Sequence, residues 1–182
     1  MIRDILIDYG FFGPWTWLFS LIGRIIPTNK NLILFGSNHG MHASDNAYAL
    51  FRHMNQNPGV LETLWITRNK EVYEMIHSEF PGKVVMAFSP RGFLSYFRTY
   101  QVVISHSYLD MCLMPYYRGK VVNYIWHGVP IRKCGRMLKS NKSEIASGFW
   151  KHWSRWNKHA DNYFASNKYE IKVMKVAFGI DE

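Results

Sequence analysis

The residues best suited to chemistry in this chain lie in segment 121–133, where an apolar, β-favouring run ends at a histidine. His127 and Gly128 follow the run, and Arg132 and Lys133 make the next residues strongly basic. In an open α/β sheet, residues just past the carboxyl end of a strand face the ligand crevice. An imidazole followed by cations suits chemistry on a phosphate-bearing substrate, and the alternative is a structural histidine that braces a turn.

The loop 36–46 is a second candidate, because it follows one apolar run and precedes a helical one. Backbone N–H groups at such a turn can bind an anion. Ser44 or Asp45 is placed to cap the helix, and we expect Asp45 and Asn46 to shape the loop. The alternative is a flexible loop with an ordinary helix cap.

Other signatures of catalysis are missing or weak. No GxGxxG follows the first predicted strand, and the chain has no GxSxG elbow. Ser105 and His106 are neighbours, but adjacent residues on a strand point to opposite faces, so we expect them not to pair. His39 and His42 lack a convincing third ligand, so the evidence for a zinc site is weak. We expect neither a metal nor a cofactor.

The elements that must position these residues alternate along the chain. Short apolar runs predict strands, and segments with apolar residues at helical spacing predict helices between them. This alternation predicts an α/β fold, a Rossmann-like parallel sheet with helices on both faces. The predicted strands are 32–35, 60–66, 83–87, 102–104, 121–126 and 162–165, and the predicted helices are 45–56, 69–79, 89–100 and 168–177.

The composition fits a folded, basic protein. Hydrophobic residues make up 48% of the chain and aromatic residues 16%, which argues against disorder, and the net charge is +9. A basic surface favours anionic partners, whether nucleic acid, acidic lipid headgroups or phosphorylated substrates. Cys112 and Cys134 form no CxxC pair, so reduced thiols in a cytosolic compartment are the simplest interpretation.

Two segments suggest a membrane surface. Residues 1–30 are expected to form a membrane-proximal amphipathic segment, because the apolar run 11–26 is too short and too interrupted to span a bilayer. A helix packed on its own domain is equally compatible with this run. Stretch 132–158 mixes cations with tryptophans, which suits a membrane interface, single-stranded nucleic acid or a packing stripe.

Segment 126–133, Trp-His-Gly-Val-Pro-Ile-Arg-Lys, resembles the WHGTPLKK signature of the CDP-glycerol glycerophosphotransferases, the polymerases and primases of bacterial teichoic acid. Four further segments resemble family elements in the same order, and they are 44–46, 64–66, 161–167 and 177–180. This sequence departs from the signature where Val129, Ile131 and Arg132 replace Thr, Leu and Lys. The lost threonine hydroxyl removes one possible contact to phosphate.

The resemblance implies the N-terminal domain of a glycosyltransferase-B-like fold. Residues 31–182 would form the Rossmann-like, acceptor-side domain, truncated before the donor-binding domain. The implied reaction moves glycerol phosphate from CDP-glycerol, or a related CDP-polyol, to a lipid-linked acceptor. His127 would be the general base, and Arg132 and Lys133 would neutralise phosphate charge. The expected substrate-binding residues are Ser44, Asp45, Asn46, Gly128, Pro130, Arg132 and Lys133.

The resemblance also implies partners and a location. We expect a CDP-glycerol donor held by the missing second domain, a lipid-linked acceptor and an anionic membrane surface, and no nucleic acid. The protein would be peripheral, at the cytoplasmic face of the bacterial cell membrane. The alternative is a non-catalytic, basic membrane- or polyanion-binding module derived from such an enzyme.

Overall fold

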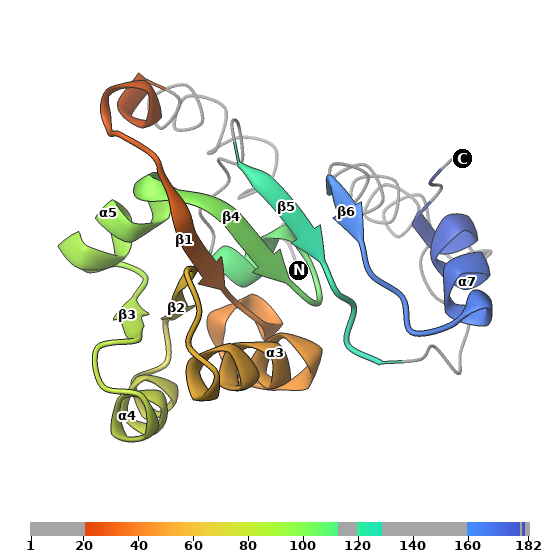
Figure 1. Cartoon of the computed structure of the whole chain (residues 1–182), viewed down its shortest axis with the longest axis horizontal. Helices are drawn as coiled ribbons and strands as arrows, with labels where there is room; N and C mark the ends of the chain where they lie inside the picture. The colour runs from red at the N-terminus through yellow and green to blue at the C-terminus, as the bar shows by residue number, and fades with distance from the viewer. Residues whose placement is uncertain (1–20, 113–119, 129–159, 179, 181–182) are drawn as a thin grey trace, which may run out of the picture.

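The computed structural model describes residues 21–112, 120–128, 160–178 and 180. At its centre is a six-stranded sheet in the order β3-β2-β1-β4-β5-β6, in which all neighbouring strands are parallel (Figure 1). The strands are β1 (Asn29–Phe35), β2 (Glu62–Thr67), β3 (Val84–Met86), β4 (Thr99–Ile104), β5 (Val121–Tyr124) and β6 (Asn162–Tyr163).

Helices cover both faces of this sheet. On one face Phe51 and Ile76, from the two helices that flank β2, join a buried cluster with Phe35 of β1. On the other face Tyr96 and Met174, from two later helices, join a second cluster. The predicted parallel α/β sheet with helices on both faces is therefore confirmed. The helices are α3 (Asp45–Gln56), α4 (Lys70–Glu79), α5 (Pro90–Arg98) and α7 (Lys168–Phe178).

The central strands read as unbroken apolar runs because both of their faces are buried. In β1, Ile33 and Phe35 face the cluster under α3 and α4, whereas Leu34 faces the opposite cluster. Neighbouring β4 repeats the pattern, with Val103 on the first face and Ile104 on the second. Alternating side chains of a strand point to opposite faces, so a sheet covered on both sides needs apolar residues at every position.

Several predicted boundaries differ from the observed ones. The third predicted helix extends to residue 100, but α5 ends at Arg98 and β4 begins at Thr99. The buried Thr99 hydroxyl donates a hydrogen bond to the Leu32 carbonyl oxygen across the sheet (2.9 Å), and this tertiary contact fixes the junction. β1 begins at Asn29 rather than at residue 32.

A buried lysine fixes the start of β5. The Lys120 ammonium donates to the carbonyl oxygens of Tyr96 (2.6 Å) and Thr99 (2.8 Å) at the end of α5, and lies 5.0 Å from the Tyr96 ring centroid. A cation at the carboxyl end of a helix is favourable. Burial still disfavours the charged form and lowers the pKa of Lys120 to about 8. The contact sets where β5 begins, and β5 leads directly to His127.

The end of the expected N-terminal segment touches the domain. Ile22 and Ile26 pack against the buried cluster that contains Leu34 and Tyr96. Residues 1–20 lie outside the described residues, and the division at residue 30 stays a prediction. Across the described ranges, no helix is both long enough and apolar enough to cross a membrane.

The strand order places a crevice between β1 and β4. From β1 the chain builds outward through β2 and β3, and it then returns to the other side of β1 to build β4, β5 and β6. At such a reversal the loops after the two central strands leave in opposite directions, and ligands of open α/β sheets bind there. The loops that follow β1, β4 and β5 meet at this edge, and they carry the candidate residues.

Candidate functional site

Asp110 joins the loop after β4 to the loop after β1. Its buried carboxylate accepts hydrogen bonds through Oδ2 from the backbone N–H groups of Ser105 (2.9 Å), His106 (2.7 Å) and Ser107 (3.2 Å). Through Oδ1 it accepts one from the backbone N–H of His39 (2.9 Å). Hydrogen bonds to an ionised acceptor are the strong ones. The two loops therefore form one rigid base for the site.

Two glycines let these loops approach each other. A Cβ at Gly36 would collide with the carbonyl oxygen of Asp110, and one at Gly40 would collide with the Cys112 sulfur. Gly40 also has φ +75°, a conformation that side chains disfavour. Burial raises the pKa of the Cys112 thiol to about 12, so it stays protonated and packs as an apolar residue.

His106 lies between a serine and an aspartate. Its Nδ1 is 2.9 Å from Ser105 Oγ, and its Nε2 is 3.6 Å from Asp45 Oδ2. The expectation that Ser105 and His106 do not pair is therefore wrong, because β4 ends at Ile104 and the alternation of strand residues stops there. Ser105 is fully buried, so its hydroxyl orients the imidazole and is not exposed as a nucleophile.

Asp45 begins helix α3 and is held by two serines. Ser37 Oγ and Ser44 Oγ donate to Asp45 Oδ2 at 3.3 Å and 3.0 Å. Ser44 occupies the N-cap position, as expected, but its hydroxyl bonds the aspartate rather than a helix N–H. Asp45 has φ 64°, so the start of α3 is strained. The carboxylate is thus fixed in place beside His106.

Asn46, the next residue of α3, holds the loop that carries His127. Its Nδ2 donates to the carbonyl oxygens of Ile125 (3.2 Å) and Trp126 (3.1 Å). Trp126 has φ 52° and Gly128 has φ 134°, both in the region that favours glycine. Strained backbone of this kind persists only where surrounding contacts hold it, and it concentrates at functional sites.

The His127 imidazole is stacked against two rings. The His106 ring lies 4.4 Å away at an interplanar angle of 15°, and the Trp126 ring lies 4.4 Å away at 23°. The side chain still keeps an exposed edge. Desolvation by these neighbours lowers the pKa of His127 below its ordinary value of 6.5, and the charge on His106 lowers it further. The opposing effects of Asp45 and Asp110 are smaller, so the ring is neutral at neutral pH.

This arrangement can move a proton. A neutral imidazole with an exposed edge can accept a proton from a hydroxyl group brought to the crevice. Among the described residues, apart from the chain neighbours of Gly128, no heavy atom lies within 4 Å of where a Cβ would be. A substrate can therefore approach the backbone beside the imidazole. Within the described ranges, no three His, Cys, Asp or Glu side chains are grouped as metal ligands.

The structure brings together five of the predicted site residues, from two segments far apart in the sequence, and these are Ser44, Asp45, Asn46, His127 and Gly128. Pro130, Arg132 and Lys133 lie outside the described residues. Neither the pairing of His106 with His127 nor the role of Asp110 was predicted from the sequence. The Ser-x-x-Asp pattern from Ser107 to Asp110 forms a capping box, and this pattern could have revealed the turn.

The fold and the site define an α/β domain with an exposed histidine at the carboxyl edge of a parallel sheet. The family model described as CDP-Glycerol:Poly(glycerophosphate) glycerophosphotransferase matches residues 18–182, and the chain belongs to this family. The resemblance found at segment 126–133 is therefore confirmed.

The relatives and the solved structures that resemble this chain are also enzymes of teichoic acid synthesis. A teichoic acid glycerol-phosphate transferase of Staphylococcus aureus is 29% identical over 89% of this chain, and a teichoic acid poly(glycerol phosphate) polymerase of Bacillus spizizenii is 25% identical over 88%. The chain spans only 40% and 42% of these two relatives. A structure of the wall teichoic acid polymerase TagF with CDPG superposes with a TM-score of 0.72 at 17% identity, over 91% of this chain and 40% of that one. This likeness shows that the chain shares the fold of the matched part of that structure, the parallel α/β sheet described above.

Proposed function

We propose that this chain is the acceptor-side half of a teichoic acid glycerophosphotransferase. The reaction transfers glycerol phosphate, or a related polyol phosphate, from a CDP-activated donor to a lipid-linked acceptor. Family membership supports the class of reaction, and the two relatives are named as a glycerol-phosphate transferase and a poly(glycerol phosphate) polymerase. Because the chain spans about 40% of each relative, we assign the donor site to a second domain.

His127 acts as the general base in this proposal. An acceptor hydroxyl oxygen forms a bond to the phosphorus that carries the glycerol, and its proton passes to the neutral imidazole. The bond between that phosphorus and the bridging oxygen breaks, and CMP leaves with the electron pair. The stacked, desolvated position of His127 carries the assignment, because it keeps the ring neutral with one edge exposed.

The other predicted residues support this step. Asp45 and Ser44 position His106, and Asn46 positions the loop before His127. Gly128 gives the acceptor access to the backbone, and Pro130 stiffens the turn. We assign Arg132 and Lys133 to the phosphate, where their charge would offset the negative charge of the transition state. The enzyme would work peripherally at the cytoplasmic face of the membrane, where lipid-linked acceptors are elongated.

Replacing His127 by alanine tests the proposal. In the full-length protein, we expect His127→Ala to lower kcat for glycerol phosphate transfer about a hundredfold to ten-thousandfold, the usual contribution of a general base. His53→Ala is the matched control, because His53 is an exposed histidine on α3, and it should leave kcat unchanged. Circular dichroism should show that both variants fold.

Near-normal transfer by a folded His127→Ala variant would reject the assigned role. If the wild-type protein bound anionic vesicles yet transferred no glycerol phosphate, the basic membrane-binding module would be the better description.

A further inference from the structure

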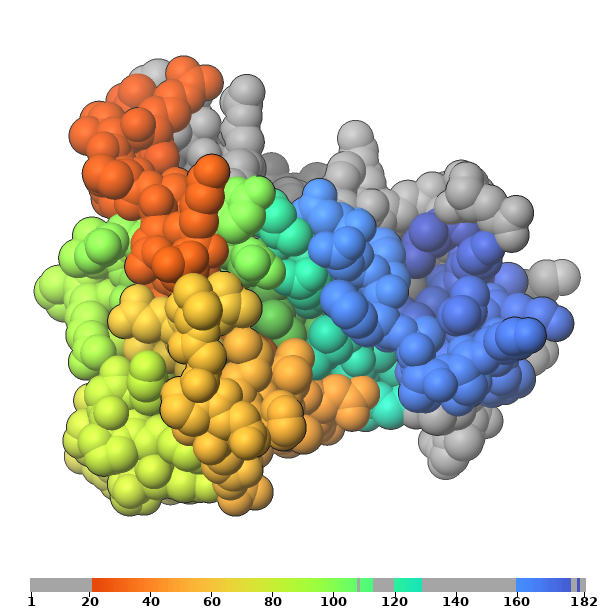
Figure 2. All heavy atoms as spheres, viewed as in Figure 1, coloured from red at the N-terminus to blue at the C-terminus, as the bar shows by residue number. Residues whose placement is uncertain are grey.

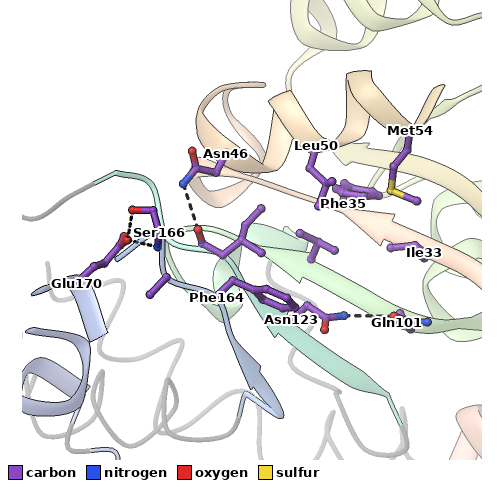
Figure 3. A pocket seen from close by; sticks show the side chains of 13 residues that line it. Ile33, Phe35, Asn46, Leu50, Met54, Gln101, Asn123, Phe164, Ser166 and Glu170 are labelled. Atoms are coloured by element: carbon purple, nitrogen blue, oxygen red, sulfur yellow. Dashed lines mark hydrogen bonds between the residues drawn. The ribbon is translucent and has the colours of Figure 1, made fainter. Parts of the chain in front are cut away.

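A cavity of about 430 Å³ opens on the sheet face that also carries α3. Its floor is formed by β1, β4 and β5, through side chains such as Ile33 and Val103. Helix α3 forms one wall, and the segment that follows β6 forms the other (Figure 3). In Figure 2 the green and teal atoms of β4 and β5 lie recessed between α3 and the blue segment after β6. The volume suits a small molecule.

Polar residues line this cavity at both ends. Figure 3 shows Ser166 and Glu170 at one end and Gln101 at the other, with Phe164 between them. Among the described residues, Gln101 Oε1 accepts from Asn123 (3.4 Å), and its Nε2 has no acceptor there. Asn46 uses its Nδ2 on two carbonyl oxygens, which leaves its Oδ1 as an acceptor. The cavity thus offers both a donor and an acceptor.

Glu170 supplies a second acceptor. Its side chain is buried at the first turn of α7, and Oε2 accepts from the Ser166 backbone N–H and hydroxyl, both at 2.6 Å. Both hydrogen bonds end on Oε2. Among the described residues no donor bonds Oε1, so this oxygen can accept a hydrogen bond from a ligand. The two short hydrogen bonds from Ser166 already pair this carboxylate within the protein, so it does not require a cationic ligand.

The charge of the lining selects against anions. Among the described lining residues there is no Lys, Arg or His, and Glu170 is the ionisable group. A phosphate or carboxylate placed here would meet a fixed negative charge without a compensating cation. A purely apolar occupant could not bond Gln101 Nε2, Asn46 Oδ1 or Glu170 Oε1, the polar atoms of the lining that make no hydrogen bond to a described residue, and covering them is costly. The lining favours a neutral ligand with several hydrogen-bonding groups.

We propose that this cavity binds a neutral, polyhydroxylated ring of the pyranose type. A hydroxyl group donates and accepts, so it satisfies both kinds of polar atom. The exposed Phe164 ring (53% exposed) and the aliphatic floor can pack against the C–H faces of a sugar. Asn46 lines the cavity and also holds the carbonyls before His127, so the site adjoins the reactive edge. Assignment of this ring to the acceptor rests on the proposed function.

Binding to the full 182-residue chain tests the cavity directly. The probes are methyl glucoside, its anionic counterpart methyl glucuronide, and cyclohexanol, titrated by saturation-transfer NMR. We expect methyl glucoside to bind better than either counterpart. Gln101→Leu removes the donor with little change in volume and should weaken methyl glucoside binding about two- to tenfold, the worth of one or two hydrogen bonds. Phe164→Ala should also weaken methyl glucoside binding.

Gln56→Leu is the matched control, because it makes the same substitution at an exposed position of α3 outside the cavity lining. Equal binding of methyl glucuronide or cyclohexanol would overturn the proposal. So would equal binding by the Gln101→Leu and Gln56→Leu variants, or no saturation transfer to methyl glucoside.

The His127→Ala variant separates this inference from the proposed function. If His127→Ala transfers glycerol phosphate normally while Gln101→Leu weakens sugar binding, the catalytic assignment fails and the sugar site stands. If His127→Ala abolishes transfer while Gln101→Leu leaves methyl glucoside binding unchanged, the sugar-site proposal is rejected and the catalytic assignment stands.

Discussion

At the scale of single residues, the chemistry depends on what surrounds one imidazole. His127 is stacked against Trp126 and against His106, and desolvation by burial, followed by the charge on His106, keeps its pKa below the ordinary value. His106 is itself fixed by Ser105 and Asp45. His106 therefore acts through His127, as a positioning residue that also disfavours protonation of its neighbour.

Replacing His106 tests this coupling. His106→Asn removes a ring that desolvates His127 and a neighbouring charge that opposes its protonation, so both effects raise the pKa of His127 toward 6.5. Histidine side-chain NMR titration of the chain should show a wild-type pKa below 6.5 and a higher one in the variant, with His127→Gln identifying the signal. A wild-type value at or above 6.5, or no change on substitution, would contradict the stacked arrangement.

The sequence alone could indicate His127 but not its partners. An apolar run that ends in His-Gly followed by cations is a local pattern, and it can be recognised without any knowledge of packing. The contact of His39 with Asp110 joins residues that are 71 positions apart. Such contacts depend on how β1 and β4 pair in the sheet, and no periodicity in a single sequence encodes that pairing.

At the scale of elements, the first turn of α3 organises the site. Asp45 contacts His106 from the β4 loop, and Asn46 holds the β5 loop through two carbonyl oxygens. One helix end therefore connects three loops that leave neighbouring strands. This geometry requires strained φ angles at Asp45 and Trp126, and the hydrogen bonds of Asp45 and Asn46 hold these residues in place.

Asn46→Ala should loosen the β5 loop more than it harms the fold. Loss of two hydrogen bonds to carbonyl oxygens should cost about 1–3 kcal/mol of the free energy of unfolding, and misplacing His127 should lower kcat/KM about tenfold or more. Asn57→Ala is the matched control, because its amide donates to a carbonyl oxygen at the other end of α3. Denaturant unfolding and transfer kinetics measure both effects. Equal kinetics in the two variants would show that Asn46 does not position the loop.

The types of element were predictable, but several of their ends were not. Apolar runs and helical spacing are local properties, and within the part of the chain that the structure describes they located the six strands and the four helices α3, α4, α5 and α7. The junction between α5 and β4 was misplaced, because the Thr99 hydroxyl bonds a carbonyl of β1, a strand 67 residues earlier. The short helices at Asn38–Gly40 and Tyr108–Met111 were also missed, because loop-to-loop packing fixes them.

At the scale of the whole molecule, strand order decides where function can lie. The reversal between β1 and β4 gathers three loops at one edge of the sheet, and the sugar-sized cavity opens on the adjoining face. The proposed base and the proposed acceptor site are thus neighbours, connected through Asn46. The CDP-activated donor would reach the same edge from the second domain.

The pH dependence of kcat/KM for glycerol phosphate transfer by the full-length protein tests the role of His127 most directly. The base must be deprotonated to accept a proton, so activity should fall as pH drops through the lowered pKa of His127. We predict an acidic limb with its midpoint below 6.5, shifted upward by His106→Asn and absent from the residual activity of His127→Gln. An acidic limb that persists unchanged in the His127→Gln variant would contradict the assignment of His127 as the base.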